Sequence, residues 1–132
     1  MDPNKFRIDS AVLEGAYKQV YDFYARNRAS IKFPRMAILS GQPGAGKSTV
    51  FSMIENQFDP DKRPVHVDID ETRGFNDRLD EIFEADPFAT AFYTNKDSWL
   101  LTKRLLDDSK SASNNVIYET TLRSIDNMEE LI

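Results

Sequence analysis

The stretch that decides the fold is Gly41-Gln42-Pro43-Gly44-Ala45-Gly46-Lys47-Ser48, which fills the pattern G-x-x-x-x-G-K-S/T. A short apolar run at residues 36–39 precedes it and is typical of a buried strand. Residues 48–57 follow with apolar side chains at helical spacing, which predicts a helix. A strand, a glycine-rich loop and a helix in this order are the context that a phosphate-binding loop requires, and they argue against an incidental glycine-rich turn.

The residue types of this loop suit the binding of a triphosphate. Glycines at positions 41, 44 and 46 allow the main chain to turn with its N–H groups pointing inward, where side chains would block the phosphates. The following helix directs its positive N-terminal end to the same place. In such a loop Lys47 reaches the β- and γ-phosphates, and the Ser48 hydroxyl ligates Mg²⁺. We therefore expect the chain to bind ATP with Mg²⁺ through Gly41, Gln42, Pro43, Gly44, Ala45, Gly46, Lys47, Ser48 and Thr49.

The composition indicates a single domain over residues 1–132 and argues against several kinds of protein. The chain is 40% hydrophobic and 30% charged, which is enough apolar material for a core of its own. It has no cysteine and therefore no disulfides or thiolate metal sites. Its net charge of −5 argues against non-specific nucleic-acid binding, which depends on clustered Lys and Arg. We see no signal peptide and no apolar run near the roughly 20 residues of a membrane span, so we expect a cytoplasmic protein without membrane or nucleic-acid partners.

Helical and strand patterns alternate along the chain. Apolar residues at three- and four-residue spacing predict a first helix over residues 9–27, with Asp9 or Ser10 as its cap. The other expected segments are strands at 36–39, 65–70 and 116–118, helices at 48–57, 79–83, 99–106 and 124–132, and a polar loop at 109–114. This alternation predicts an α/β fold, a parallel sheet of the P-loop NTPase or kinase type flanked by helices.

Acidic residues stand at the ends of the second and third expected strands. Asp68 and Asp70 lie at the end of one, and Glu119 lies at the end of the other. Ligands of open α/β sheets bind outside the carboxyl ends of the strands, so we expect these carboxylates to face the phosphate loop. A kinase needs such a group to orient an acceptor hydroxyl and take its proton. If the strand continues to residue 70, Asp68 and Asp70 share one face, and the alternative is a solvated acidic loop.

Glu119 and three neighbouring residues, Arg73, Arg123 and His66, each have more than one possible role. Glu119 either orders Mg²⁺, as an acid after an apolar strand does in other P-loop proteins, or accepts hydrogen bonds from a sugar. Arg73 and Arg123 either bind a phosphate or lie on the surface. His66 is the only histidine, and we expect it to have a structural role because metal sites usually need several such ligands.

Three segments together resemble the zeta-toxin family. They are residues 41–48, residues 67–73 with the sequence Val-Asp-Ile-Asp-Glu-Thr-Arg, and residues 116–123 with the sequence Val-Ile-Tyr-Glu-Thr-Thr-Leu-Arg. Their order and approximate spacing also agree with the family. The resemblance extends over nearly all of this chain and over the N-terminal part of a typical member.

The resemblance implies a P-loop kinase of a bacterial toxin–antitoxin system. Such a kinase transfers the γ-phosphate of ATP to the 3′-hydroxyl of the amino sugar in UDP-N-acetylglucosamine, and a small helical antitoxin blocks its ATP site. By resemblance, Lys47 and Ser48 hold the phosphates and Mg²⁺, and Asp70 is the candidate base. The expected substrate-binding residues are Asp68, Arg73, Glu119, Thr121 and Arg123.

The sequence also departs from the family pattern. No His-Pro dipeptide follows the acidic pair, where this chain has Gly74-Phe75-Asn76. The helix before the third strand offers Ser98, Trp99 and Thr102 where the family places a substrate-binding glutamate. A second hypothesis is therefore a P-loop kinase that acts on the hydroxyl of another nucleotide or of an antibiotic.

Only three strands can be found, whereas kinases of this kind have five in the order 2-3-1-4-5. We expect the three strands to pair as 2-3-1 and the domain to be truncated at its C-terminus. A third hypothesis is therefore an inactive fragment that binds a nucleotide or a partner protein.

Overall fold

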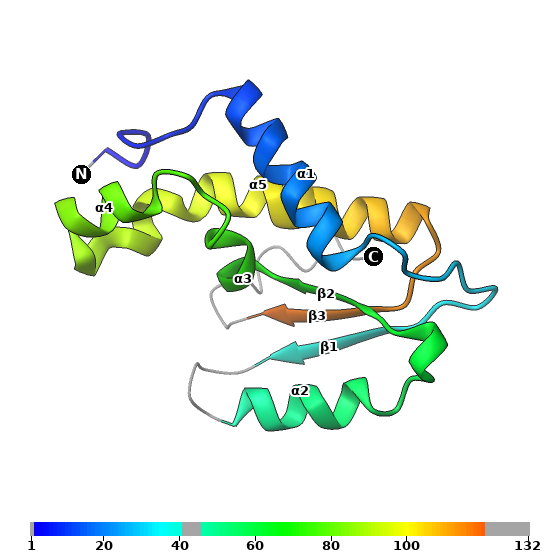
Figure 1. The fold of residues 1–132 in the computed structure, drawn as a ribbon. Coiled ribbons are helices and arrows are strands. Elements are labelled where there is room, and N and C mark those ends of the chain that lie inside the picture. The colour runs from blue at the N-terminus through cyan, green and yellow to red at the C-terminus, as the bar shows by residue number, and fades with distance from the viewer. Residues whose placement is uncertain (1, 41–45, 121–132) are drawn as a thin grey trace.

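A parallel sheet of three strands forms the centre of the computed structural model, which describes residues 2–40 and 46–120. The strands are β1 (Met36–Ser40), β2 (Val65–Asp68) and β3 (Val116–Thr120), and their order β1-β3-β2 confirms the expected 2-3-1 pairing. All three point the same way (Figure 1). In the register, Glu119 of β3 lies opposite Leu39 of β1 on one side and Asp68 of β2 on the other.

Helices cover both faces of this sheet. Helix α2 (Lys47–Glu55) lies on one face, and α1 (Ser10–Tyr24) and α5 (Thr90–Ser111) lie on the other (Figure 1). The main core is formed where α1 and α5 meet β2 and β3, and it includes Val20, Val65, Val67, Leu105 and Val116. Strand β3 is buried along its whole length, which explains why its sequence starts as a continuous apolar run rather than an alternating one.

Short helices connect the second strand to α5. These are α3 (Ile69–Arg73), α4 (Leu79–Ala85) and the 3₁₀ segment η2 (Pro87–Ala89), while another 3₁₀ segment, η1 (Pro60–Lys62), precedes β2. Ile82 of α4 packs with Phe6, Ala89 and Tyr93 in a second, smaller apolar cluster. This cluster holds the N-terminal segment against the start of α5.

The second strand is shorter than its sequence suggests. We expected a strand over residues 65–70, but β2 ends at Asp68 and α3 begins at Ile69. The Asp68 side chain accepts a hydrogen bond from the Asp70 N–H at 3.0 Å and so caps the new helix. The expectation that Asp68 and Asp70 share a strand face is therefore wrong, since Asp70 lies in the first turn of a helix.

Helix α5 is much longer than the predicted helix at residues 99–106. It runs from Thr90 to Ser111, and the first part of the predicted polar loop at 109–114 belongs to it. The buried side of its N-terminal half carries Thr94, Asp97 and Ser98, which interrupt the apolar periodicity that marks a helix in sequence.

The remaining predicted helices agree in type with α1, α2 and α4, and Asp9 caps α1 as expected. The helix predicted at residues 124–132 lies outside the described residues. Within the described part of the chain, no helix combines the length and apolar character that crossing a membrane requires.

Candidate functional site

The carboxyl ends of the three strands meet at one edge of the sheet, next to the start of α2 (Figure 1). Gly46 precedes α2 with a φ of +80°, a left-handed conformation that glycine adopts without strain. Nothing lies within 4 Å of the position where a Cβ would be, so the backbone angle and not the available space favours glycine here. Ser48 and Thr49 are exposed in the first turn of α2. The backbone N–H groups at the start of a helix point toward its N-terminal end and have no acceptor within the helix.

Several expected site residues lie outside what the structure describes. These are Gly41, Gln42, Pro43, Gly44, Ala45, Thr121 and Arg123, together with the side chain of Lys47. Their roles remain predictions from the sequence.

The structure brings Asp68 and Glu119 together and adds His66, which the sequence had suggested was structural. His66 Nε2 lies 2.6 Å from Glu119 Oε2 and 3.9 Å from Asp68 Oδ2. His66 and Asp68 alternate with the core residues Val65 and Val67 along β2, so they project from the face opposite to the α1 and α5 layer. The period-two pattern of this strand was the available signal that His66 accompanies Asp68.

Aromatic rings fix the orientation of the histidine. The Phe51 ring of α2 lies 4.2 Å from the His66 ring, centroid to centroid, and the Tyr24 ring of α1 lies edge-on at 6.3 Å. The Tyr24 hydroxyl donates a hydrogen bond to Glu71 Oε2 at 3.1 Å. Through Phe51, helix α2 contacts His66, and His66 in turn pairs with Glu119.

The environment of Asp68 favours its protonated form. Burial is the main cause, followed by the hydrogen bond to Glu119, and together they raise the pKa of Asp68 to about 7 although the Asp70 N–H acts in the opposite direction. With its pKa near 7, the Asp68 carboxyl group can either donate or accept a proton near neutral pH.

Asp70 and Arg73 form a second pair on α3. Arg73 Nη1 donates to Asp70 Oδ1 at 2.5 Å, and the same guanidinium donates to Thr94 Oγ1 at 2.9 Å and Asn95 Oδ1 at 2.7 Å. The Asp70 side chain is half exposed, whereas that of Arg73 is largely buried. No sequence pattern singles out Thr94 and Asn95, because only the position of α5 brings them to Arg73.

Ser98 and Thr102 lie inside the protein. They are two of the residues that stand where the family pattern has a glutamate. The Thr102 hydroxyl lies 2.7 Å from that of Thr72, and it also donates to the Ser98 carbonyl at 2.7 Å. Both serine and threonine are buried, while Trp99 is half-buried. These contacts join α3 to α5.

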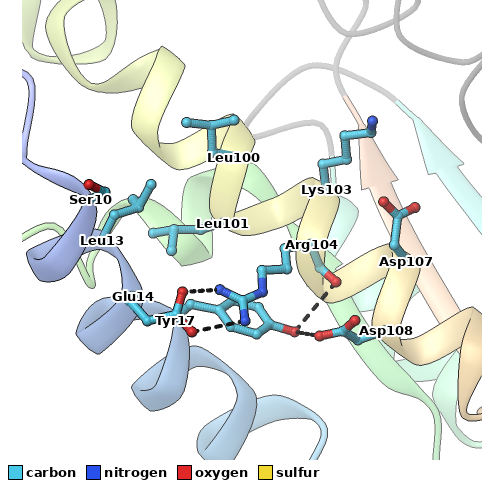
Figure 2. A pocket seen from close by; sticks show the side chains of 10 residues that line it. All are labelled: Ser10, Leu13, Glu14, Tyr17, Leu100, Leu101, Lys103, Arg104, Asp107 and Asp108. Carbon is cyan, nitrogen blue, oxygen red and sulfur yellow. Dashed lines mark hydrogen bonds and ion pairs between the residues drawn. The ribbon is translucent and has the colours of Figure 1, made fainter.

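A hollow of about 440 Å³ lies elsewhere, between α1 and α5 (Figure 2). Four of its polar side chains bind one another in two pairs, since Arg104 donates to both oxygens of Glu14 and the Tyr17 hydroxyl donates to Asp108 at 2.5 Å. Burial and this hydrogen bond raise the pKa of Tyr17. Among the residues that the structure describes, no expected site residue lines this hollow.

The architecture defines the class of the protein, which is an α/β protein with a parallel sheet in the P-loop kinase order. Acidic residues stand at the ends of two adjacent strands of this sheet. A family model described as Zeta toxin matches residues 21–132. The chain therefore belongs to the zeta toxin family.

A solved structure supports the same fold. It comes from the molecular and structural characterization of the PezAT chromosomal toxin–antitoxin system of Streptococcus pneumoniae, and it matches with a TM-score of 0.83 at 23% sequence identity. The match covers 94% of this chain and 51% of that chain, so the present chain spans about half of its length. A search of curated proteins finds no match.

Proposed function

We propose that this chain is the nucleotide-binding part of an ATP-dependent kinase of the zeta-toxin type. The proposed reaction transfers the γ-phosphate of ATP to the 3′-hydroxyl of UDP-N-acetylglucosamine, and the protein acts in the cytoplasm as the toxin of a toxin–antitoxin pair. The observation that carries the proposal is the strand order. It sets Glu119 directly beside β1, the strand that leads into the phosphate loop, with Asp68 on its other side.

The residues around the start of α2 fit a nucleotide with Mg²⁺. The exposed Ser48 hydroxyl and the strand-end carboxylates are oxygen donors, which Mg²⁺ prefers. Bound Mg²⁺ would neutralise charge on the β- and γ-phosphates. Ser48 is the residue we assign to the metal, and the main-chain amides of the loop with Lys47 are assigned to the phosphates.

The acceptor side would use the acids and the ordered arginine. Asp70 is the proposed base and takes the proton of the acceptor hydroxyl. The oxygen of that hydroxyl then attacks the γ-phosphorus, and ADP leaves. Arg73 fixes the direction of the Asp70 carboxylate and keeps a partly exposed guanidinium beside it. Glu119 would accept hydrogen bonds from the sugar. Thr121, Arg123, Asp68 and Arg73 would hold the remainder of the nucleotide sugar.

The direct test is phosphate transfer observed by mass spectrometry. The chain, and the longest reading frame that contains it, are incubated with Mg·ATP and UDP-N-acetylglucosamine. We expect addition of one phosphate group to the sugar nucleotide and a loss of at least about 10²-fold in rate for Asp70→Asn. Asp61→Asn, in the exposed segment η1, is the matched control and should retain the rate. An unmodified sugar nucleotide with the full reading frame would contradict the proposal.

A different acceptor is the second candidate. It is favoured by the missing His-Pro dipeptide and by the inward position of Ser98 and Thr102, which leave no glutamate on that side of α5. The same assay with other nucleotides and with hydroxyl-bearing antibiotics separates the two candidates, because only one acceptor class should gain phosphate.

An antitoxin partner follows from the same family. If a small helical protein occupies the ATP site, it should compete with Mg·ATP for this chain in calorimetry. A chain that binds nucleotide and the partner but transfers no phosphate would instead be an inactive binding fragment.

A further inference from the structure

We propose that His66, Asp68 and Glu119 form a binding site for a divalent transition-metal ion such as Zn²⁺ or Co²⁺. This site is separate in chemistry from the Mg²⁺ of the proposed kinase reaction, because it includes a nitrogen ligand. Binding of the metal does not depend on the proposed kinase function.

The three side chains are already close enough to share one ion. One ligand atom from each residue can be chosen so that all of them lie within 4.8 Å of one another. A tetrahedral Zn²⁺ with bonds of about 2.0–2.1 Å needs ligand atoms about 3.4 Å apart. The observed separations of 2.6 Å from His66 to Glu119 and 3.9 Å from His66 to Asp68 lie on either side of that value. Small side-chain rotations therefore suffice to admit the ion.

The backbone holds the ligands in place. Asp68 and Glu119 are opposite each other in the register of adjacent strands, and His66 is two residues before Asp68 on the same face of β2. Rigid strands position ligands more accurately than loops do. The His66 ring is held between Phe51 and Tyr24, which limits its rotation.

Burial distinguishes this group from an ordinary acidic surface. The side chains of His66, Asp68 and Glu119 are 20%, 14% and 9% exposed. Two carboxylates and an imidazole brought together out of water are stabilised by a cation that neutralises them. The remaining exposure of these side chains allows an ion to reach them and a water molecule to complete the coordination.

The ligand types select the metal. Imidazole nitrogen with carboxylate oxygen suits Zn²⁺, Co²⁺ and Ni²⁺, whereas Mg²⁺ and Ca²⁺ prefer oxygen ligands alone. On the proposed function, a metal held here would occupy Glu119 and compete with the acceptor sugar. Zn²⁺ would then act as an inhibitor of the acceptor side of the site.

The test uses the untagged chain, in which His66 is the only histidine. After removal of metals with EDTA and desalting, Co²⁺ is added, and binding is followed by visible absorption and by calorimetry with Zn²⁺. We expect one ion per chain, a Co²⁺ spectrum typical of mixed nitrogen and oxygen ligands, and retention of Zn²⁺ in excess Mg²⁺. The imidazole signals in NMR spectra should shift with the same stoichiometry.

His66→Gln is the decisive variant, because glutamine can still donate a hydrogen bond to Glu119 and so preserves the local contact. We expect it to weaken Zn²⁺ affinity at least about tenfold, and Glu119→Gln to do the same. Asp61→Asn is the control and should bind as the unaltered chain does. Circular dichroism and the thermal midpoint show whether each variant is folded.

Equal Zn²⁺ affinity in His66→Gln and the unaltered chain would overturn the proposal, and so would the absence of bound Co²⁺ from the unaltered chain. Neither result depends on phosphate transfer, so failure of the metal site and failure of the proposed kinase function are distinguished.

Discussion

Asp68 shows how the position of a single carboxyl group gives the stability of the protein a particular pH dependence. Its folded-state pKa of about 7 lies above the value of about 3.9 for an unfolded aspartate. The folded state therefore binds the proton more tightly, so this contribution to stability is complete below about pH 4 and is lost as the pH rises through 7. The loss is roughly 2–4 kcal/mol, because each pKa unit corresponds to about 1.4 kcal/mol.

We predict that Asp68→Asn removes most of this pH dependence. Asparagine caps a helix as well as aspartate does, so the bond to the Asp70 N–H can persist. Urea unfolding between pH 5 and pH 8, in EDTA, should show a decline for the unaltered chain and a flatter profile for the variant. Parallel profiles would show that Asp68 ionises normally in the folded state.

Asp97 provides a second prediction at the level of single residues. Its fully buried carboxylate on α5 accepts hydrogen bonds from Arg7 Nε at 2.8 Å and from the Ile8 N–H at 3.1 Å. Asp97→Ala leaves both donors without this acceptor, and we expect a loss of about 2–4 kcal/mol in the free energy of unfolding. Glu14→Ala, which breaks an exposed ion pair with Arg104, should cost much less. Similar losses for both variants in urea unfolding would contradict the role assigned to burial.

At the level of elements, the sequence predicted the strands better than the helix ends. The apolar residues of β3 form a visible run because this strand is buried along its whole length in the middle of the described sheet. Strand β1 also shows a short apolar run, although it lies at one edge of the described sheet and is only partly buried. The end of β2 was missed although a signal was present, since Asp68 with Glu71 three residues later matches a helix-capping pattern. Asp68 and Glu119 do lie at the ends of adjacent strands, whereas Asp70 lies in α3, and the pairings of these acids depend on side-chain packing that spacing alone does not give.

Helix α5 was underestimated for a physical reason. Its N-terminal half buries Thr94, Asp97 and Ser98 instead of apolar residues, and their partners come from α3 and the N-terminal segment. A pattern search for apolar residues finds only the half that packs on the sheet. Arg73 and Asn95, which are 22 residues apart in sequence, are likewise brought together only by the packing of α3 against α5.

The packed half of α5 yields a prediction for the element as a whole. Leu105 is fully buried between α1 and the sheet, whereas Leu100 on the same helix is 43% exposed. Leu105→Ala should lower the free energy of unfolding by about 2–5 kcal/mol, because the cavity cannot close fully. Leu100→Ala should change it by less than about 1 kcal/mol. Equal effects in chemical denaturation would mean that α5 does not pack as described.

At the scale of the whole molecule, the core and the candidate site occupy different parts of the sheet. The main core lies between the sheet and the layer formed by α1 and α5, while the strand-end acids Asp68 and Glu119 lie at the carboxyl edge of the sheet. This separation allows residues of the site to be changed without removing the core. It also means that a nucleotide bound at the edge should stabilise the entire folded chain through mass action.

We therefore predict that Mg·ATP raises the thermal midpoint of this chain. At a concentration 100 times the dissociation constant, the gain is about 2.7 kcal/mol, provided that the unfolded chain does not bind. Lys47→Ala should abolish most of the shift, because the lysine of a phosphate loop contacts the β- and γ-phosphates. Lys62→Ala is the matched control, since Lys62 is exposed on η1 and only weakly paired with Asp59 at 3.8 Å. If both variants respond to Mg·ATP as the unaltered chain does, the loop does not bind the triphosphate, and the kinase proposal loses its basis even if the acids at the edge of the sheet bind a metal.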